Sequence, residues 1–379
     1  MPKKNLPISY IELSSENLIS NFLNFRKLIH KNTKIAFAIK GNAYGHGQNE
    51  IAKIAEKYVD YFFVNNLLEL KALRKLTKKP TFLFGYVKIS DLKEATKYNA
   101  IISIFNKEQL IELIKISEKN KKTIEVHLPV DALLGREGLS LKQFIEILEI
   151  LKSAKYIKLG GIYGHFANIE DVNNFTHAKK QIKEYDKFLK ILVKYNFKNV
   201  ATHLSATSGI LVYEKGKGIN NIVRIGIGGY GLWPSEHIKY LYKNKLELKP
   251  VLALKTTLAQ IKTLPPNRTI GYGLTYTTYE ETKIGIIPLG YAEGLDRRLS
   301  NIGKVLIHGE KCKILGRVSM NMIVVDLSKL KEVKIEDEVV LIGEQKDNTI
   351  TADEIANKVG SINYEVVTRL SSILPRVIK

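Results

Sequence analysis

The chain has 379 residues, of which 45% are hydrophobic and 26% charged, a composition typical of a folded protein with one large and one smaller domain. The opening MPKKNLPISY lacks the apolar core of a signal peptide, and no run approaches the roughly 18 apolar residues of a membrane helix. The single cysteine, Cys312, excludes an intramolecular disulfide and a cysteine-based zinc site. We expect a cytoplasmic protein that binds neither a metal nor a membrane.

The net charge of +21 raises the question of a nucleic-acid partner. The lysines are spread along the chain, in stretches such as LTKKP, KNKKT and KYLYKNKLELK, and no arginine-rich face or stacking motif stands out. This distribution is typical of lysine-rich helix surfaces and loops. We therefore expect no nucleic-acid partner.

Apolar stretches rich in β-branched and aromatic residues recur along the first two thirds of the chain. We predict eight strands, at residues 34–40, 61–66, 81–86, 100–105, 124–130, 157–166, 199–206 and 221–231. Most of the intervals carry a helical pattern. After Ser140, for example, Leu141, Phe144 and Leu148 line one face, and Ser140 with Gln143 fits a capping box. The last interval, SGILVYEKGKG, predicts only a short helix.

This alternation predicts an α/β fold, a (β/α)8 TIM-type barrel with a parallel core, followed by a β-rich C-terminal domain. We place the barrel in residues 1–242 and leave open whether the first residues join the second domain. Residues 243–379 carry closely spaced strands with short turns, and only TADEIANKVG in this part has a helical pattern.

Sites in such barrels gather at the carboxyl ends of the strands. The residues at these ends are Lys40, Arg136, His165, Thr207, Ser208 and the stretch 226–231. Lys40 follows an apolar strand and precedes turn residues, where a surface lysine is the simpler interpretation. His165 follows an apolar run, and a core histidine is the simpler interpretation there.

The stretch GIGGYG, residues 226–231, matches the dinucleotide fingerprint G-x-G-x-x-G. That fingerprint requires a helix directly after the glycines and an acidic residue about 20 positions on. Trp233 and Pro234 follow instead. The glycines are better explained by backbone amides that approach a single phosphate. A lysine, a phosphate site and a barrel together suggest pyridoxal phosphate held as a Schiff base.

The sequence resembles alanine racemase, a two-domain fold-type III enzyme of that cofactor. AIKGNAYGHG is similar to the family's cofactor-lysine signature, and GHFANIED, VRIGIGGYG, IGYGLTY, PLGYAEG, GRVSMNM and SINYEV match further segments in order. The likeness covers nearly the whole chain. It implies a homodimer that interconverts L- and D-alanine, supplies D-alanine for peptidoglycan, and has composite sites drawn from both subunits.

The resemblance also implies a role for each site residue. Lys40 holds the cofactor, and its phosphate is bound by Tyr44, Thr207, the amides of Gly226 and Ile227, and Tyr364. Arg224 hydrogen-bonds the pyridine nitrogen, and His165 lies between Arg224 and the second base, Tyr272. The substrate carboxylate is held by Arg136 and the backbone at Met320, and Tyr291 narrows the entrance.

The chemistry is consistent with these residue types, because racemisation needs two bases on opposite faces of the α-carbon. Lysine and tyrosine have unperturbed pKa values near 10, so each must be shifted to act near neutral pH. Arg224, acting through His165, is expected to lower the pKa of Tyr272. Because a guanidinium does not give up its proton, the ring nitrogen beside Arg224 stays unprotonated.

Three positions depart from the family's pattern. Relatives often carry a lysine, sometimes carbamylated, where this chain has Pro129, so another anion must brace Arg136 or the arginine is held more loosely. Asn321 stands where aspartate is common, and Thr207 where serine is usual. Tyr272 and Tyr291 could also be ordinary aromatics of the β-rich domain.

We expect no chemical role for several other residues. We expect Glu69 and Arg74 on an exposed helical face and Cys312 in a strand.

Two alternative functions remain open from the sequence. One is a broad-specificity or serine racemase of the same fold, and the other is a non-enzymatic barrel that carries the cofactor.

Overall fold

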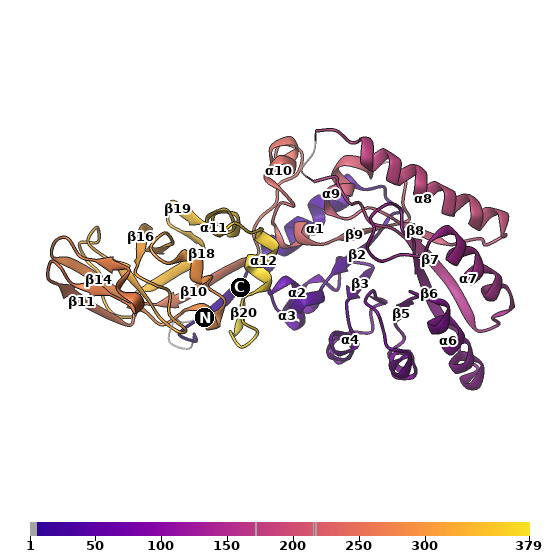
Figure 1. Cartoon of the computed structure of the whole chain (residues 1–379), viewed down its shortest axis with the longest axis horizontal. Helices are drawn as coiled ribbons and strands as arrows, with labels where there is room; N and C mark the ends of the chain where they lie inside the picture. Colours follow the sequence, from indigo (N-terminus) through magenta and orange to yellow (C-terminus); the bar gives the residue numbers. More distant parts are fainter. Residues whose placement is uncertain (1–5, 171–172, 215, 217) are drawn as a thin grey trace. The chain divides into compact units, whose positions relative to one another are not determined.

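The computed structural model describes residues 6–170, 173–214, 216 and 218–379 (Figure 1). The chain divides into two compact units. The barrel unit contains Leu18–Gly41 and Ile51–Lys249. The strand-rich unit contains the described part of Met1–Asn17 together with Asn42–Glu50 and Pro250–Lys379. Each unit is described by itself below.

The barrel unit is built on an eight-stranded parallel sheet in the order β8-β7-β6-β5-β4-β3-β2-β9. Its strands are β2 (Lys34–Ala38), β3 (Tyr61–Val64), β4 (Thr81–Leu83), β5 (Ile101–Ser103), β6 (Ile124–Pro129), β7 (Ile157–Tyr163), β8 (Ala201–His203) and β9 (Ile222–Ile225). Each lies within a stretch for which the sequence predicts a strand, so the predicted fold class is confirmed.

The sheet curves into a nearly closed barrel whose seam lies between β8 and β9. One backbone hydrogen bond crosses the seam, from Arg224 N to Ser205 O at 2.9 Å. Two asparagine side chains add further hydrogen bonds across the seam: Asn220 Oδ1 accepts from Leu204 N, and Asn221 Oδ1 accepts from Thr202 N. Side-chain amides thus satisfy backbone donors that an ideal ladder would pair.

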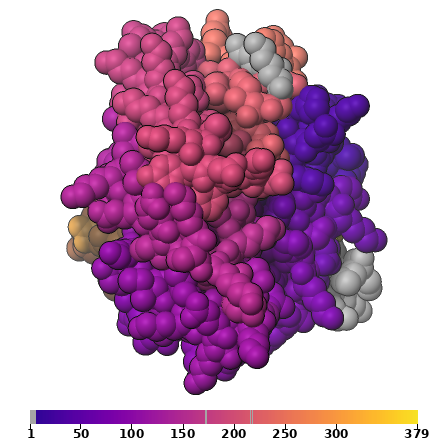
Figure 2. Space-filling model, turned by 90° about the vertical axis from the view of Figure 1, so that its right-hand side faces the viewer, coloured from indigo at the N-terminus to yellow at the C-terminus, as the bar shows by residue number. Residues whose placement is uncertain are grey.

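Figure 2 shows a face of the molecule that is formed largely by residues of the barrel unit. Helices surround the barrel. They are α1 (Ser15–Leu28), α3 (Gln48–Ala55), α4 (Leu67–Arg74), α5 (Leu92–Ala95), α6 (Lys107–Asn120), α7 (Leu141–Ser153), α8 (Thr176–Lys194), α9 (Thr207–Gly209) and α10 (Glu236–Tyr242). The predicted capping box at Ser140 and Gln143 is present at the start of α7. The predicted short helix before β9 is α9, continued by a π-helical turn at Ile210–Glu214.

Aromatic and imidazole rings fill part of the barrel interior. His127 on β6 and His203 on β8 lie with Nδ1 and Nε2 2.8 Å apart, and both are buried. Their rings contact Phe82, and the ring of His203 stacks on that of Tyr163 at 5.1 Å. The barrel is therefore a packed core rather than a pore.

The strand-rich unit holds one large sheet, in the order β11-β14-β17-β16-β15-β18-β10-β1-β20, with β19 paired to β18. Its strands are β1 (Tyr10–Leu13), β10 (Leu252–Thr257), β11 (Gln260–Leu264), β14 (Thr282–Ile287), β15 (Lys304–Ile307), β16 (Glu310–Leu315), β17 (Ile323–Asp326), β18 (Glu338–Gln345), β19 (Asn348–Ile350) and β20 (Arg376–Ile378). A separate pair joins β12 (Thr269–Ile270) to β13 (Tyr276–Thr277). β1 runs antiparallel to β10 and parallel to β20.

Two helices of this unit lie near the C-terminal end, α11 (Ala352–Val359) and α12 (Asn363–Thr368). The sequence pattern predicts α11 alone, so the expectation of a single helix is wrong. α12 has only six residues, too few to show a periodic apolar face. Across the described residues, no helix is both long enough and apolar enough to cross a membrane.

Candidate active site

Lys40 begins a turn of unusual handedness. β2 ends at Ala38, and the next element, α2 (Lys40–Tyr44), has left-handed backbone angles. The φ values are 60° at Gly41, 52° at Asn42, 54° at Ala43 and 53° at Tyr44. Non-glycine residues in this region are disfavoured by roughly 1–2 kcal/mol each, and such strain clusters at functional sites. The motif KGNAYGHG therefore encodes a strained turn that fixes the backbone at the lysine.

Glu69 on α4 stabilises the start of this turn. Its Oε1 accepts a hydrogen bond from Gly41 N at 2.7 Å, and its Oε2 accepts one from Asn65 N at the same distance. Arg74 on the same helix donates to Tyr98 O at 2.7 Å and Lys79 O at 3.0 Å. The expectation of a merely exposed helical face is therefore wrong, because both side chains bind backbone groups that lie distant in sequence.

The surroundings of Lys40 favour its neutral amine. Burial lowers the pKa of Lys40, and the positive charges of Arg136 and Arg224 lower it further, whereas Glu137 and Glu69 oppose the shift. Lys40 is thus not an ordinary surface lysine. A depressed pKa increases the fraction of amine that can act as a nucleophile or base at neutral pH.

Arg224, on β9, is a buried cation. Its Nη2 donates to Gly164 O at 2.5 Å and Leu204 O at 2.9 Å, and its guanidinium lies over the ring of Tyr163 at 5.5 Å. Burial lowers the pKa of Arg224 to about 10, so it stays charged at neutral pH. Among the described residues, no carboxylate pairs with it and its buried Nε has no hydrogen-bond partner.

His165 lies two residues beyond β7 and near this arginine, with Nδ1 3.5 Å from Arg224 Nη2. Burial lowers the pKa of His165 to about 3, with the charges of Arg224 and Arg136 acting in the same direction. The imidazole is therefore neutral at physiological pH. It is half-buried beside Arg224 rather than enclosed in the core, unlike His127 and His203.

Thr207 and the glycine-rich stretch meet across the seam between β8 and β9. The hydroxyl of Thr207 accepts from Gly226 N at 3.3 Å and from Gly228 N at 3.4 Å. Ile227 begins a 3-10 turn, where its own amide finds no acceptor within the turn. A Cβ on Gly228 would lie 2.6 Å from the ring of Phe25 and equally close to Thr207 Cγ2. Close packing thus requires this glycine.

Ser208, by contrast, donates its hydroxyl hydrogen to Glu170 Oε1 at 2.8 Å. The sequence places this hydroxyl at the same strand end as that of Thr207. In the structure, the Ser208 hydroxyl is hydrogen-bonded to a carboxylate instead. Thr207 therefore remains the hydroxyl that faces the glycine amides.

Apart from Arg136, which lies in the barrel unit, the remaining candidates belong to the strand-rich unit. The rings of Tyr44 and Tyr364 have centroids 6.1 Å apart. Gly45 has its backbone against α12, since a Cβ there would lie 1.8 Å from Val367 O. Arg376 Nη2 also donates to Gly45 O at 2.7 Å. The segment that follows Lys40 is thus fixed to α12, which carries Tyr364.

Tyr291 and Met320 lie on adjacent turns. Tyr291 N donates to Ser319 O at 3.1 Å, and Ala292 N donates to Met320 O at 2.9 Å. Asn321 Nδ2 donates to Glu293 Oε1 at 2.8 Å, which connects the same two turns. This hydrogen bond explains why an asparagine stands at position 321, because an ionised aspartate could not donate to the carboxylate of Glu293.

Tyr272 lies between Gly271 and Gly273, both with φ near 70°, and its side chain is 72% exposed in the isolated chain. It belongs to the strand-rich unit, and Lys40 belongs to the barrel unit. The sequence prediction that these two residues form a catalytic pair therefore stays a prediction.

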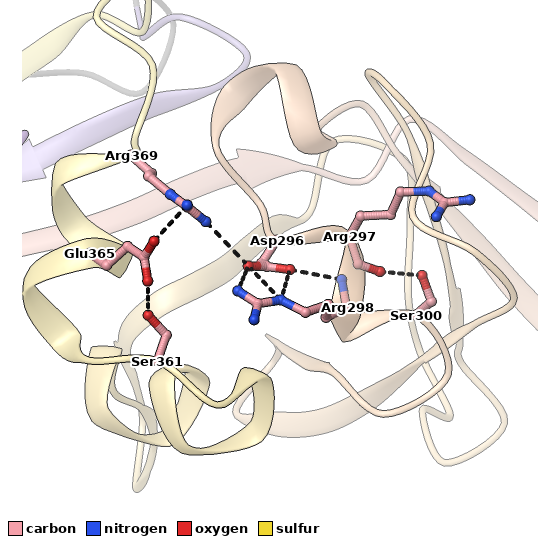
Figure 3. A network of polar contacts seen from close by, with 7 residues as sticks. All are labelled: Asp296, Arg297, Arg298, Ser300, Ser361, Glu365 and Arg369. Atoms are coloured by element: carbon pink, nitrogen blue, oxygen red, sulfur yellow. Dashed lines mark hydrogen bonds and ion pairs between the residues drawn. The ribbon is translucent and has the colours of Figure 1, made fainter.

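A network of charges beside these turns was not anticipated from the sequence (Figure 3). Arg369, the C-cap residue of α12, bridges Glu365, at 2.5 Å, and Asp296, at 3.8 Å. Arg298 donates to the same Asp296 at 2.6 Å. Ser361 also donates to Glu365. Its members span about 75 positions, so no local motif reveals it. It fixes α12, and with it Tyr364, to the loop that follows Tyr291.

Two family models match the chain, the alanine racemase N-terminal domain over residues 13–234 and the alanine racemase C-terminal domain over residues 251–378. The chain belongs to the alanine racemase family. It is 35% identical over 373 residues to Alanine racemase 2 of Bacillus subtilis, a match that covers 97% of this chain and 93% of that relative. The resemblance read from the sequence is thereby confirmed.

Solved alanine racemases share the fold. The enzyme of Clostridium difficile 630 superimposes with a TM-score of 0.91 at 32% identity, covering 99% of this chain and 97% of that one. The enzyme of Bacillus anthracis with bound L-Ala-P gives a TM-score of 0.91 at 31% identity, covering 99% and 95%. The chain is therefore an amino-acid racemase, an isomerase. A non-enzymatic barrel that carries a cofactor is not supported.

Proposed function

We propose that this alanine racemase family member interconverts L- and D-alanine with pyridoxal 5′-phosphate bound at the barrel mouth. The observation that carries the proposal is Arg224, a buried cation whose Nε has no acceptor among the described residues. A buried charge without a counter-ion is unfavourable unless a ligand supplies a hydrogen-bond acceptor. The pyridine nitrogen of the cofactor is such an acceptor.

The other residues present also fit this group. Thr207 and the amide of Ile227 offer donors for a phosphate, as do the hydroxyls of Tyr44 and Tyr364. The amide of Gly226, 3.3 Å from the hydroxyl oxygen of Thr207, would be shared between that oxygen and the phosphate. Lys40, with its lowered pKa, is suited to a covalent link with the aldehyde. Bound pyridoxal phosphate withdraws electron density from the substrate's α-carbon and so makes the α-proton acidic.

In this proposal the chain's own residues bind the substrate and move its proton. Arg136 and the backbone at Met320 hold the carboxylate, and Tyr291 narrows the entrance. The amine of Lys40 exchanges the proton on one face of the α-carbon, and the hydroxyl of Tyr272 exchanges it on the other. The neutral His165 lies beside Arg224 and, in this proposal, connects that arginine to Tyr272.

The wider setting of the reaction follows from the same family membership. We place the enzyme in the cytoplasm, where it supplies D-alanine for peptidoglycan. The active assembly is a homodimer in which each site combines the barrel residues of one subunit with Tyr272 and Met320 of the other. Such a dimer has two equivalent sites related by a twofold axis.

Two measurements test this function directly. Incubation of the purified protein with L-alanine, followed by chiral chromatography, should yield equal amounts of the two enantiomers, and L-serine run in parallel tests the broader alternative. Borohydride should attach the cofactor to the peptide AIKGNAYGHG, and Lys40→Ala should abolish this adduct. An adduct on another lysine, or D-alanine formation without cofactor, would contradict the proposal.

A further inference from the structure

The loop between β6 and α7 carries Arg136, and hydrogen bonds within the loop help to set its shape. Leu139 N donates to Pro129 O at 2.9 Å, and Asp131 N donates to Leu139 O at 3.1 Å, so the two ends of the loop are hydrogen-bonded. Asp131 Oδ1 accepts from the amides of Leu134 and Gly135. The loop is therefore a structured turn.

Gly138 closes this turn, and no larger residue fits there. Its φ is +135°, and a Cβ would lie 2.4 Å from Asp131 N. Pro129, at the start of the loop, is buried and carries neither a charge nor an N–H. Position 129 thus offers nothing that could hold a guanidinium in place.

Arg136 is instead paired with its neighbour Glu137. The guanidinium uses its Nε–Nη2 edge, with Nη2 donating to Glu137 Oε1 at 2.8 Å and Nε donating to Oε2. This is the two-pronged geometry in which arginine and carboxylate pair most strongly. The opposite edge, formed by Nη1 and the second hydrogen of Nη2, remains available for another carboxylate.

Glu137 is also a negative charge among several positive ones. Arg136 and Arg224 lower the pKa of Lys40, and Glu137 opposes this shift. The charge of Arg136 in turn helps to hold the pKa of the Glu137 carboxyl below its usual range. The carboxylate is half-buried, whereas the arginine is more exposed, so Glu137 is the better-fixed partner. Among the described residues, no other carboxylate forms an ion pair with Arg136.

We propose that Glu137 is the positioning residue that orients Arg136 toward the carboxylate of the substrate, the task that Pro129 cannot perform. This inference rests on the proposed role of Arg136. A fixed guanidinium binds a carboxylate more tightly than a mobile one, because less side-chain entropy is lost on binding. Glu137 should therefore act on substrate affinity more than on the proton-transfer step.

The test compares Glu137→Gln, Glu137→Asp and Arg136→Lys, with Glu184→Gln as the control. Glu184 pairs with Lys187 on the outer helix α8 at 2.7 Å, so this substitution removes an ion pair that does not involve Arg136. We expect Glu137→Gln to raise the KM for alanine and the inhibition constant of propionate by the same factor, about tenfold, with kcat nearly unchanged. Glu137→Asp should restore part of the affinity, and Glu184→Gln should match wild type.

The outcomes separate this inference from the proposed function. If Arg136→Lys raises both constants and Glu137→Gln raises neither, Glu137 does not position Arg136 and the inference is wrong. If Arg136→Lys also leaves both unchanged, the role proposed for Arg136 is wrong. A fall in kcat alone, or an equal effect of Glu184→Gln, would likewise overturn the inference.

A measurement on the unmutated protein tests the inference without kinetic data from the Glu137 variants. The Nε–H resonance of Arg136, assigned by its loss in Arg136→Lys, should be protected from solvent exchange in nitrogen-15 NMR spectra. Protection should weaken as pH falls through the titration of Glu137. An averaged, rapidly exchanging signal at neutral pH would show that the guanidinium is mobile and would overturn the inference.

Discussion

At the scale of single residues, the barrel interior contains two histidines that must stay neutral. His127 Nδ1 and His203 Nε2 share one hydrogen, and His127 Nε2 lies 3.7 Å from Glu125. These contacts fit a tautomer in which His127 carries its hydrogen on Nε2, facing the carboxylate, and His203 donates to His127. The buried Nδ1 of His203, which has no partner among the described residues, is then the unprotonated nitrogen.

We predict that stability falls as pH drops below about 6.5. Burial lowers the pKa of His127, and it lowers that of His203 well below its usual value. The unfolded chain therefore binds more protons than the folded one, and the stabilisation, complete above pH 6.5, is lost as the pH falls. Each such histidine contributes a slope of about 1.4 kcal/mol per pH unit. Urea unfolding at pH 7, 6 and 5 measures this slope.

The control for this prediction is a histidine outside the barrel core. His203→Gln should reduce the slope between pH 6.5 and 5 by the contribution of one histidine, even though it lowers stability at pH 7. His177→Gln, on α8, replaces a histidine outside the barrel interior and is measured in parallel. Carboxylates titrate mostly below pH 5, so they contribute little in this window. An unchanged slope in His203→Gln would contradict the assignment.

Single residues also show how far the sequence could be interpreted. Lys40, His165 and Arg224 could be placed near one another because strand ends of a parallel barrel share one face. The role of Glu69 could not, since it binds the amide of Gly41, a partner 28 positions away. The pairing of Arg136 with Glu137 depends on rotamers that the spacing of residues does not determine.

At the scale of elements, the left-handed turn α2 and the helix α12 form one packed structure. Gly45, at φ +81°, places its Cα against Val367 O and its carbonyl against Arg376. Tyr44, on the turn, and Tyr364, on the helix, are thereby held in contact. The two tyrosines proposed for the phosphate thus depend on a glycine between them in the chain.

We predict that Gly45→Ala weakens cofactor binding as well as stability. The added Cβ would lie 1.8 Å from Val367 O, so α12 must move, and Tyr364 moves with it. We expect a loss of about 2–4 kcal/mol in the free energy of unfolding of the apoprotein. The dissociation constant for pyridoxal phosphate, measured by absorbance titration, should rise as well.

The matched control is Gly360→Ala. This glycine also has a left-handed φ, +63°, but a Cβ there meets nothing within 4 Å. It should show only the backbone penalty, about 1 kcal/mol, with unchanged cofactor affinity. Equal effects of the two substitutions would mean that backbone strain, and not the contact with α12, is responsible.

Elements differ in how well sequence patterns predict them. The eight barrel strands were predictable because buried parallel strands are nearly continuous apolar runs. The turn α2 was not, since Asn42 and Ala43 give no signal for four successive left-handed residues. The helix α12 was missed because its position depends on the ion pairs of Arg369 and not on an apolar stripe.

At the scale of the whole molecule, the two proposed bases belong to different units. Lys40 is part of the barrel unit, and Tyr272 is part of the strand-rich unit. If each site combines units of two subunits, a chain lacking one base can be complemented by a chain lacking the other. The proposed homodimer therefore makes a quantitative prediction.

We predict that Lys40→Ala and Tyr272→Ala chains, each nearly inactive alone, regain racemase activity after they are unfolded and refolded together. A mixed dimer would hold one site with both bases and one with neither. With random pairing about half of the dimers are mixed, so the activity should approach about a quarter of wild type. Distinct affinity tags on the two chains would quantify the mixed dimers. Their presence without activity would place both bases in a single chain.

The pairing of β1 has a consequence for the order in which the molecule is made. Ile11 on β1 is aligned with Leu254 on β10 and with Arg376 on β20. All eight barrel strands lie between these partners in the sequence. On the ribosome, the barrel can therefore complete its sheet while β1 still waits for both neighbours. β1 emerges before the barrel strands yet is paired after them, and until then its exposed backbone is open to capture by chaperones or by neighbouring nascent chains.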